Sequence, residues 1–197
     1  MSLFGYLKLG GCVLSAALLL PAATQSQARS CPVGTPTAQS YTWNFRAEAQ
    51  GLLDDMASEA RQARENADRL HTLMSNPESD WEPQALELDR IRDTVNDMGQ
   101  KLCRLEAIRR VTSPWEQKAI AQAAPLIAAM ANDTENAITF LNNNQRDLFM
   151  PAYTSLGADL YRRSASLAKS VSEFEKFGKV HQEDIRMQKT LGLTKRS

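Results

Sequence analysis

Four stretches of the chain have the apolar spacing that is typical of amphipathic helices, and none has the alternation expected of a strand. The first stretch runs from about Trp43 to Met74. Its inward positions follow one another by about three or four residues, and many of them are alanine. Such small side chains predict that a neighbouring helix approaches closely. The predicted inward positions are Phe45, Ala49, Leu52, Met56, Ala60, Ala63, Ala67, Leu70 and Met74.

A second helix is expected after a break at Asn76-Pro77, because a proline disfavours the helical conformation in the residue before it. Either Ser79 or Asp80 can cap its start, and Pro83 is tolerated in its first turn. Its apolar positions alternate steps of three and four without interruption, which is the heptad seam of a bundle or coiled coil. They are Leu88, Ile91, Val95, Met98, Leu102 and Leu105.

The third helix has a strong start signal. Ser113 can cap it, Pro114 suits the first helical position, and Glu116 completes a capping box. The apolar period then continues to about Leu141. Pro125 falls inside this stretch, and we expect it to kink the helix rather than end it.

After three asparagines at 142–144, the fourth helix is expected from about Phe149 to Phe177. Helices of about 30 residues, each roughly 45 Å long, joined by short loops, imply antiparallel neighbours. The sequence therefore predicts an all-α fold, an up-down-up-down antiparallel four-helix bundle. An extended helical hairpin that completes its core by dimerising is the alternative, and the seam of the second helix suits it equally.

The N-terminus has the features of a secretory signal peptide, predicted over residues 1–28. Lys8 precedes a short apolar run from Cys12 to Leu20, and a small-residue cleavage pattern ends at Ala28. The run is shorter than the roughly 20 residues that span a bilayer, although an uncleaved anchor is a second interpretation. A lipoprotein signal at Cys12 is a minor alternative, because that motif should close the apolar run and here opens it.

The predicted organisation is a signal peptide at 1–28, an irregular segment at 29–42, the bundle at 43–177 and a flexible tail at 178–197. Removal of Lys8 with the signal leaves 22 basic and 23 acidic residues. This balance is unlike that of nucleic-acid-binding proteins. Basic residues at the C-terminus (Lys189, Lys195 and Arg196) are interpreted first as a solvated tail and second as a membrane or polyanion contact.

Two cysteines remain after cleavage, Cys31 and Cys103, and an even number in an oxidising compartment favours a disulfide. If the first two helices fold back about Pro77, Cys103 lies level with Gly51. That level is about 12 Å above the start of the first helix. The segment before this helix is long enough to reach it, so we predict a Cys31–Cys103 disulfide.

Few residues could carry chemistry. His71 with Asp68 resembles half of a helical di-metal site, but the predicted helices hold no second histidine to complete it. A non-covalent haem site would need His71 and a facing methionine such as Met150, and the sequence has no Cys-x-x-Cys-His motif for covalent attachment. No hydrolase or nucleotide-binding motif occurs either. We therefore predict no catalytic residues, no metal and no cofactor, with His71 and Met150 as weak cofactor-binding candidates.

Two groups of residues suggest contacts rather than catalysis. Each tryptophan stands at the start of a predicted helix (Trp43, Trp81 and Trp115). These side chains either close the ends of the bundle or form an aromatic surface for a partner. Gly51, Gly99 and Pro125 fall near one predicted end, where they allow close helix approach or form a small groove.

The function expected from the sequence is a non-enzymatic exported protein, periplasmic or secreted, that binds another protein, an envelope component or itself. Any membrane contact would be peripheral. A small-ligand or haem carrier is the alternative, and an enzyme is the least favoured class. Architecture alone is a weak guide among these functions.

Overall fold

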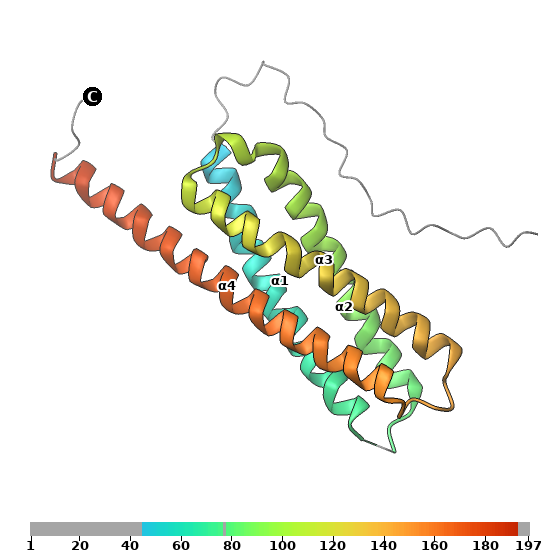
Figure 1. The fold of residues 1–197 in the computed structure, drawn as a ribbon. Helices are drawn as coiled ribbons and strands as arrows, with labels where there is room; N and C mark the ends of the chain where they lie inside the picture. Colours follow the sequence, from blue (N-terminus) through green and yellow to red (C-terminus); the bar gives the residue numbers. More distant parts are fainter. Residues whose placement is uncertain (1–44, 77, 193–197) are drawn as a thin grey trace, which may run out of the picture. The chain divides into compact units, whose positions relative to one another are not determined.

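A computed structural model describes residues 45–76 and 78–192, which form four α-helices and one short 3-10 helix (Figure 1). The α-helices are α1 (Phe45–Met74), α2 (Trp81–Ile108), α3 (Pro114–Asn143) and α4 (Pro151–Thr190), and η1 (Arg109–Val111) follows α2. No strand occurs in this part of the chain. The all-helical prediction is confirmed.

The four helices pack against one another around one core. Contacts divide the chain into units at 1–30 and 31–197, and every described residue belongs to the second unit. Within it, α1 and α3 each pack against both α2 and α4. The predicted signal peptide, Cys31 and Trp43 lie outside the described residues.

In the core, small side chains of α1 pack against larger side chains of the neighbouring helices. Of the nine inward positions predicted for α1, seven are buried, and Leu53 replaces half-buried Leu52 in the core. Five buried residues of α1 are alanines, at positions 49, 57, 60, 63 and 67. Facing elements supply larger side chains, including Leu88 and Ile91 of α2. This confirms the main apolar stripes predicted from the sequence.

The predicted start of α3 is confirmed in detail. The Glu116 carboxylate accepts hydrogen bonds from the backbone amide and from the hydroxyl of Ser113, each at 2.6 Å. The helix continues through exposed Pro125, because a proline on the solvent side leaves the core contacts intact. In the middle of the helix Met130 is buried, whereas its neighbour Ala131 is exposed.

The fourth helix is longer than its apolar period predicts. We expected it to end near Phe177, yet it continues to Thr190 through residues that the sequence assigned to a flexible tail. The added residues are rich in strong helix formers, and Gln188 donates a hydrogen bond of 2.9 Å to Asp184 one turn earlier. Gly192 then takes a φ of 68°, the left-handed conformation that commonly ends helices.

Candidate interaction surface

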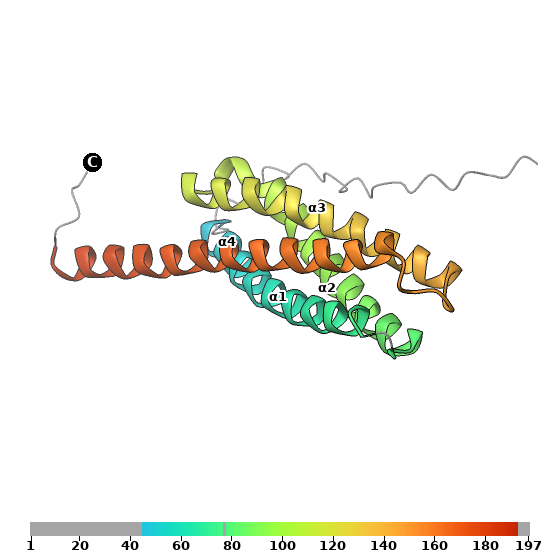
Figure 2. The same ribbon diagram turned by 60° about the horizontal axis from the view of Figure 1, so that its bottom comes forward.

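The end of α4 projects past the other three helices, as both views in Figures 1 and 2 show. Every residue from Lys179 to Gly192 is exposed. Three large apolar side chains of this projection are among the most exposed in the described chain, Val180 at 66%, Met187 at 57% and Leu191 at 69%. Single exposed apolar residues are ordinary, but three on one projecting helix form a surface.

These apolar residues share one face of α4 with a row of cations. Arg162, Lys169 and Lys176 are spaced seven residues apart, and Val180, Met187 and Leu191 continue the row at steps of four and seven. Such steps keep side chains on one side of a helix. The buried residues of α4, such as Leu160 and Leu167, point the opposite way. We call this set of six residues the outer face of α4.

The outer face belongs to a strongly basic end of the chain. Residues 176–197 contain six basic and two acidic residues, a net charge of about +4, and the remaining 17 basic and 21 acidic residues give about −4. Glu173 lies within the face, four residues after Lys169 and seven before Val180, and Glu183 and Asp184 lie at its two margins. These carboxylates reduce its positive charge locally. The chain is thus neutral in total, but its C-terminal segment is positively charged and the rest is negatively charged.

Aromatic contacts anchor the base of the projection. The Trp115 ring meets Phe177 edge to face, with ring centroids 5.7 Å apart, and Phe177 stacks on His181. Gly178 allows this approach, because a Cβ at that position would lie 2.8 Å from the indole. The side chains of Gln182 and Gln50 also hydrogen-bond, which ties α4 to α1. Beyond Gln182, no side-chain hydrogen bond or ion pair joins α4 to another helix among the described residues.

A cluster of charges lies just below the anchor. Glu175 pairs with Lys179 at 2.6 Å and with Arg61 of α1 at 3.2 Å, and its hydrogen bonds to both cations lower its pKa. Asp54 of α1 faces the same group, and burial first and the Glu175 charge second raise its pKa above the usual range. One Asp54 oxygen is buried without a hydrogen-bond partner among the described residues.

We expect Asp54→Asn to stabilise the protein slightly at neutral pH. The pKa of Asp54 is raised in the folded state, so the folded protein is relatively more stable while Asp54 is protonated. As pH rises through that pKa the carboxyl ionises and this stability is lost, whereas asparagine stays neutral. Solvent screening limits the gain to less than about 1 kcal/mol. Urea unfolding of both forms should show a difference at pH 7 that shrinks towards pH 4. A variant less stable than wild type at pH 7 would contradict this assignment.

The tryptophans found in the described chain cover the core. Trp81 begins α2 and Trp115 lies in the first turn of α3, and both are half-buried and packed against core residues. Their placement favours the interpretation in which they close the ends of the bundle. Trp43, the third member of the predicted aromatic surface, lies outside the described residues.

The two weak cofactor candidates are not brought together. His71 is half-buried in the last turn of α1 and stacks on Tyr161 of α4, with ring centroids 6.0 Å apart. Met150 is the exposed N-cap of α4, 11 residues before Tyr161 and so about 16 Å away along the helix axis. No group of His, Cys, Asp or Glu among the described residues has the arrangement of a metal site.

Close helix approach does not explain the glycines singled out from the sequence. A Cβ added to Gly51 or Gly99 would meet no atom within 4 Å. The glycine of closest approach is instead Gly157, whose Cβ would overlap the sulfur of Met74. Cys103 is half-exposed on α2, and its predicted partner Cys31 lies outside the described residues, so the disulfide stays a prediction.

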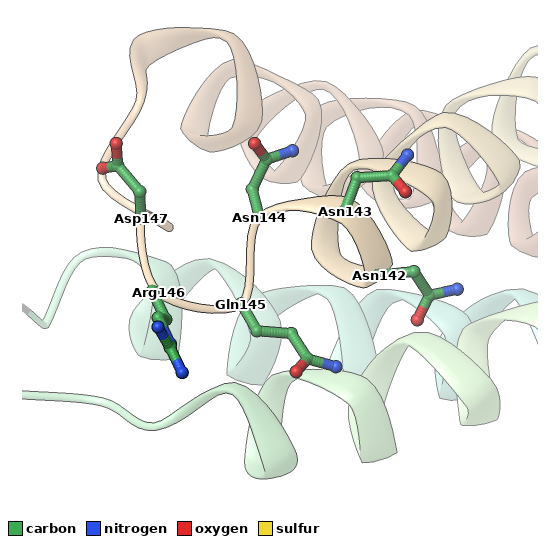
Figure 3. Close-up of a pocket in the computed structure, with 6 residues that line it drawn as sticks. All are labelled: Asn142, Asn143, Asn144, Gln145, Arg146 and Asp147. Carbon is green, nitrogen blue, oxygen red and sulfur yellow. The ribbon is translucent and has the colours of Figure 1, made fainter.

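The α3–α4 connection forms a shallow hollow, lined by the six consecutive residues from Asn142 to Asp147 (Figure 3). Their side chains point in different directions and do not converge on one point. All but Asn144 are exposed. A hollow of this kind lacks the convergent polar groups of a ligand site.

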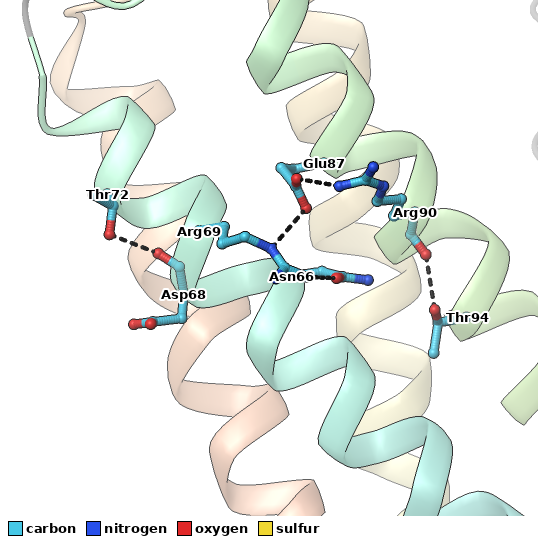
Figure 4. Close-up of polar contacts among 7 residues, drawn as sticks. All are labelled: Asn66, Asp68, Arg69, Thr72, Glu87, Arg90 and Thr94. Carbon is cyan, nitrogen blue, oxygen red and sulfur yellow. Dashed lines mark hydrogen bonds and ion pairs between the residues drawn. The ribbon is translucent and has the colours of Figure 1, made fainter.

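A buried polar cluster links α1 to α2, and the apolar stripes gave no sign of it (Figure 4). The buried Glu87 carboxylate accepts a hydrogen bond of 2.6 Å from Arg90 and lies 3.5 Å from Arg69 of α1. Arg69 also donates to Asn66 at 2.6 Å. The oxygen that faces Arg69 forms an ion pair but has no hydrogen-bond partner among the described residues. Because both neighbours of the carboxylate are cations, we interpret the cluster as a structural link between the two helices.

A second buried carboxylate, Asp133 of α3, lies 2.6 Å from the Arg163 guanidinium of α4. Buried Tyr153 stacks on Phe140, and desolvation raises the pKa of its hydroxyl. That hydroxyl has no hydrogen-bond partner among the described residues.

No described helix has a segment that is long and apolar enough to cross a membrane. Comparison of the chain with protein-family models, with curated proteins and with solved structures finds no match. The outer face of α4 is the most distinctive part of the described surface.

Proposed function

We propose that this protein is a non-enzymatic, exported helical bundle that acts as an envelope-associated binding module through the outer face of α4. The observation that carries the proposal is the projecting end of α4 (Figure 2). Val180, Met187 and Leu191 are exposed there, and their spacing places them on the side opposite the buried residues of the helix. Exposed apolar residues on a projecting element mark an interaction site more strongly than scattered ones do.

The N-terminal sequence supports export, because Lys8, the apolar run and the Ala28 site occur in the order of a cleaved signal. The Cys31–Cys103 disulfide belongs to the same proposal, since it would form in an oxidising compartment. It would tie the segment before α1 to α2.

We also propose that the bundle is up-down-up-down. Contacts between helices support this order, because early residues of one helix meet late residues of the next. Glu48 of α1 pairs with Arg104 of α2, whereas Arg69 pairs with Glu87. The same reversal relates α3 to α4, in which Trp115 meets Phe177 and Phe140 meets Tyr153.

Fractionation of cells that export the full chain tests the envelope role. We expect wild type to sediment with washed envelopes, and the variant Val180→Ser/Met187→Ser/Leu191→Ser to move to the soluble fraction. The matched control removes three similarly exposed apolar residues elsewhere, Leu86→Ser/Val111→Ser/Phe149→Ser, whose exposed fractions are 52%, 55% and 48%.

The control variant should stay with the envelopes. Recovery of wild type in the soluble fraction alone would contradict an envelope role. Equal release of the two triple variants would show that the outer face of α4 has no special part in the association.

A further inference from the structure

We infer that the outer face of α4 binds the surface of an anionic lipid bilayer. This inference rests on the proposed function and names the envelope component that the face recognises. Arg162, Lys169 and Lys176 would lie against lipid headgroups, and Val180, Met187 and Leu191 would enter the boundary between headgroups and acyl chains. The helix would lie along the membrane and not cross it.

The apolar end of the face suits a fluid surface better than a shaped protein partner. A stable protein interface buries about 800 Å² on each side and is densely packed at its centre. The three apolar side chains of the face lie on one projecting helix and offer much less. Membrane association needs only an apolar stripe that can be buried a few ångströms deep and a basic polar region.

The basic part of the face has the length and spacing for headgroup contact. Successive members of the row Arg162, Lys169 and Lys176 are seven residues apart, or about 10 Å along the helix axis. All three side chains are exposed. Each cation near an anionic membrane adds an electrostatic attraction that decays within a Debye length. Arg162 also pairs with Asp159, so its contribution is shared.

Charge along the whole chain favours one orientation. The last 22 residues carry about +4 and the rest about −4, so an anionic surface attracts the C-terminal end and repels the remainder. Lys179 and Arg186 lie at the flank of the apolar stripe, where long side chains can reach headgroups, whereas Lys189 lies on the opposite side of the helix. Glu173 within the face and Asp184 at its margin oppose the attraction, and salt weakens the electrostatic part of the binding.

Vesicle co-sedimentation of the mature chain, residues 29–197, tests the inference. The probes are phosphatidylcholine vesicles with and without phosphatidylglycerol as the anionic lipid. We expect binding only to the anionic vesicles, with a loss of at least about tenfold at high salt. Arg162→Gln/Lys169→Gln/Lys176→Gln and the triple serine variant of Val180, Met187 and Leu191 should each bind at least about fivefold more weakly.

A charge-matched control separates the face from net charge. Arg64→Gln/Arg110→Gln/Lys118→Gln removes three exposed cations from α1, η1 and α3, and it should bind as wild type does. Circular dichroism verifies that each variant keeps its helix content. Equal loss in the control and the outer-face charge variant, or equal binding to neutral vesicles, would overturn the inference.

Two further results would also overturn the inference of lipid binding, and each would point to a different partner for the outer face of α4. Envelope association without binding to anionic vesicles would leave the proposed function standing, with a protein or another polar component as the partner. A dimeric native mass that the triple serine variant converts to monomer would identify a second copy of the chain as the occupant of the face.

Discussion

Leu160→Ala is expected to lower the free energy of unfolding by about 2–5 kcal/mol, which is a large part of the stability of a domain of this size. Leu160 is fully buried on the inner side of α4. Its truncation leaves a cavity between helices that already pack closely, and the lost contacts add to the lost transfer free energy.

The same substitution at Leu191 is the matched control, because Leu191 is the C-cap of the same helix and is 69% exposed. We expect a change below about 0.5 kcal/mol there. Urea unfolding followed by circular dichroism measures both effects. Similar stabilities for the two variants would contradict the division of α4 into a buried inner side and an exposed outer face.

Removal of Arg163 should have the second large effect. Arg163→Met leaves the Asp133 carboxylate nine-tenths buried between helices with no counter-charge within ion-pair distance among the described residues. Breaking a buried pair from one side costs about 3–5 kcal/mol, and partial access of water to this site should bring the cost to the lower end.

Rescue by Asp133→Asn distinguishes an unpaired charge from lost packing. The double variant Asp133→Asn/Arg163→Met removes the charge and should recover at least about 1 kcal/mol relative to the single variant. Chemical unfolding of the four proteins of the cycle gives the coupling energy. A double variant as unstable as Arg163→Met would mean that the aliphatic part of the arginine, rather than its charge, supports the interface.

The sequence predicted the helices well because their cores repeat at helical spacing. The start of α3 followed from the local chemistry of Ser113, Pro114 and Glu116, which needs no information from distant residues. The seam of α2 was equally local, and five of its six predicted residues are buried. Local patterns of this kind determine which face of a helix turns inward.

Buried polar residues could not be predicted in the same way. Glu87 and Asp133 are charged, so a pattern of apolar positions does not include them. Their burial depends on pairing with Arg69 and Arg163, which lie on neighbouring helices. Such pairs form only when two helices are in register. The sequence alone does not give that register.

The projecting end of α4 was missed for the opposite reason. Residues beyond Gly178 have no core to face, so no period of burial marks them as helical. Their helix depends on intrinsic propensity and pairs one turn apart, such as Asp184 with Gln188. The outer face does have a local sign, the seven-residue spacing of its cations, but a stripe of apolar residues does not include them.

The alanine side of α1 gives the bundle an uneven tolerance of sequence change. Where α2 presents Leu88 and Ile91, truncation leaves a void, and larger residues have only a little room to gain. Where α1 presents Ala57, Ala60 and Ala63, nothing can be trimmed, and any added carbon must push a neighbouring helix outward. Over generations of substitution, the side chains at these alanine positions of α1 would therefore be limited by a maximum volume, and those at Leu88 and Ile91 of α2 by a minimum volume.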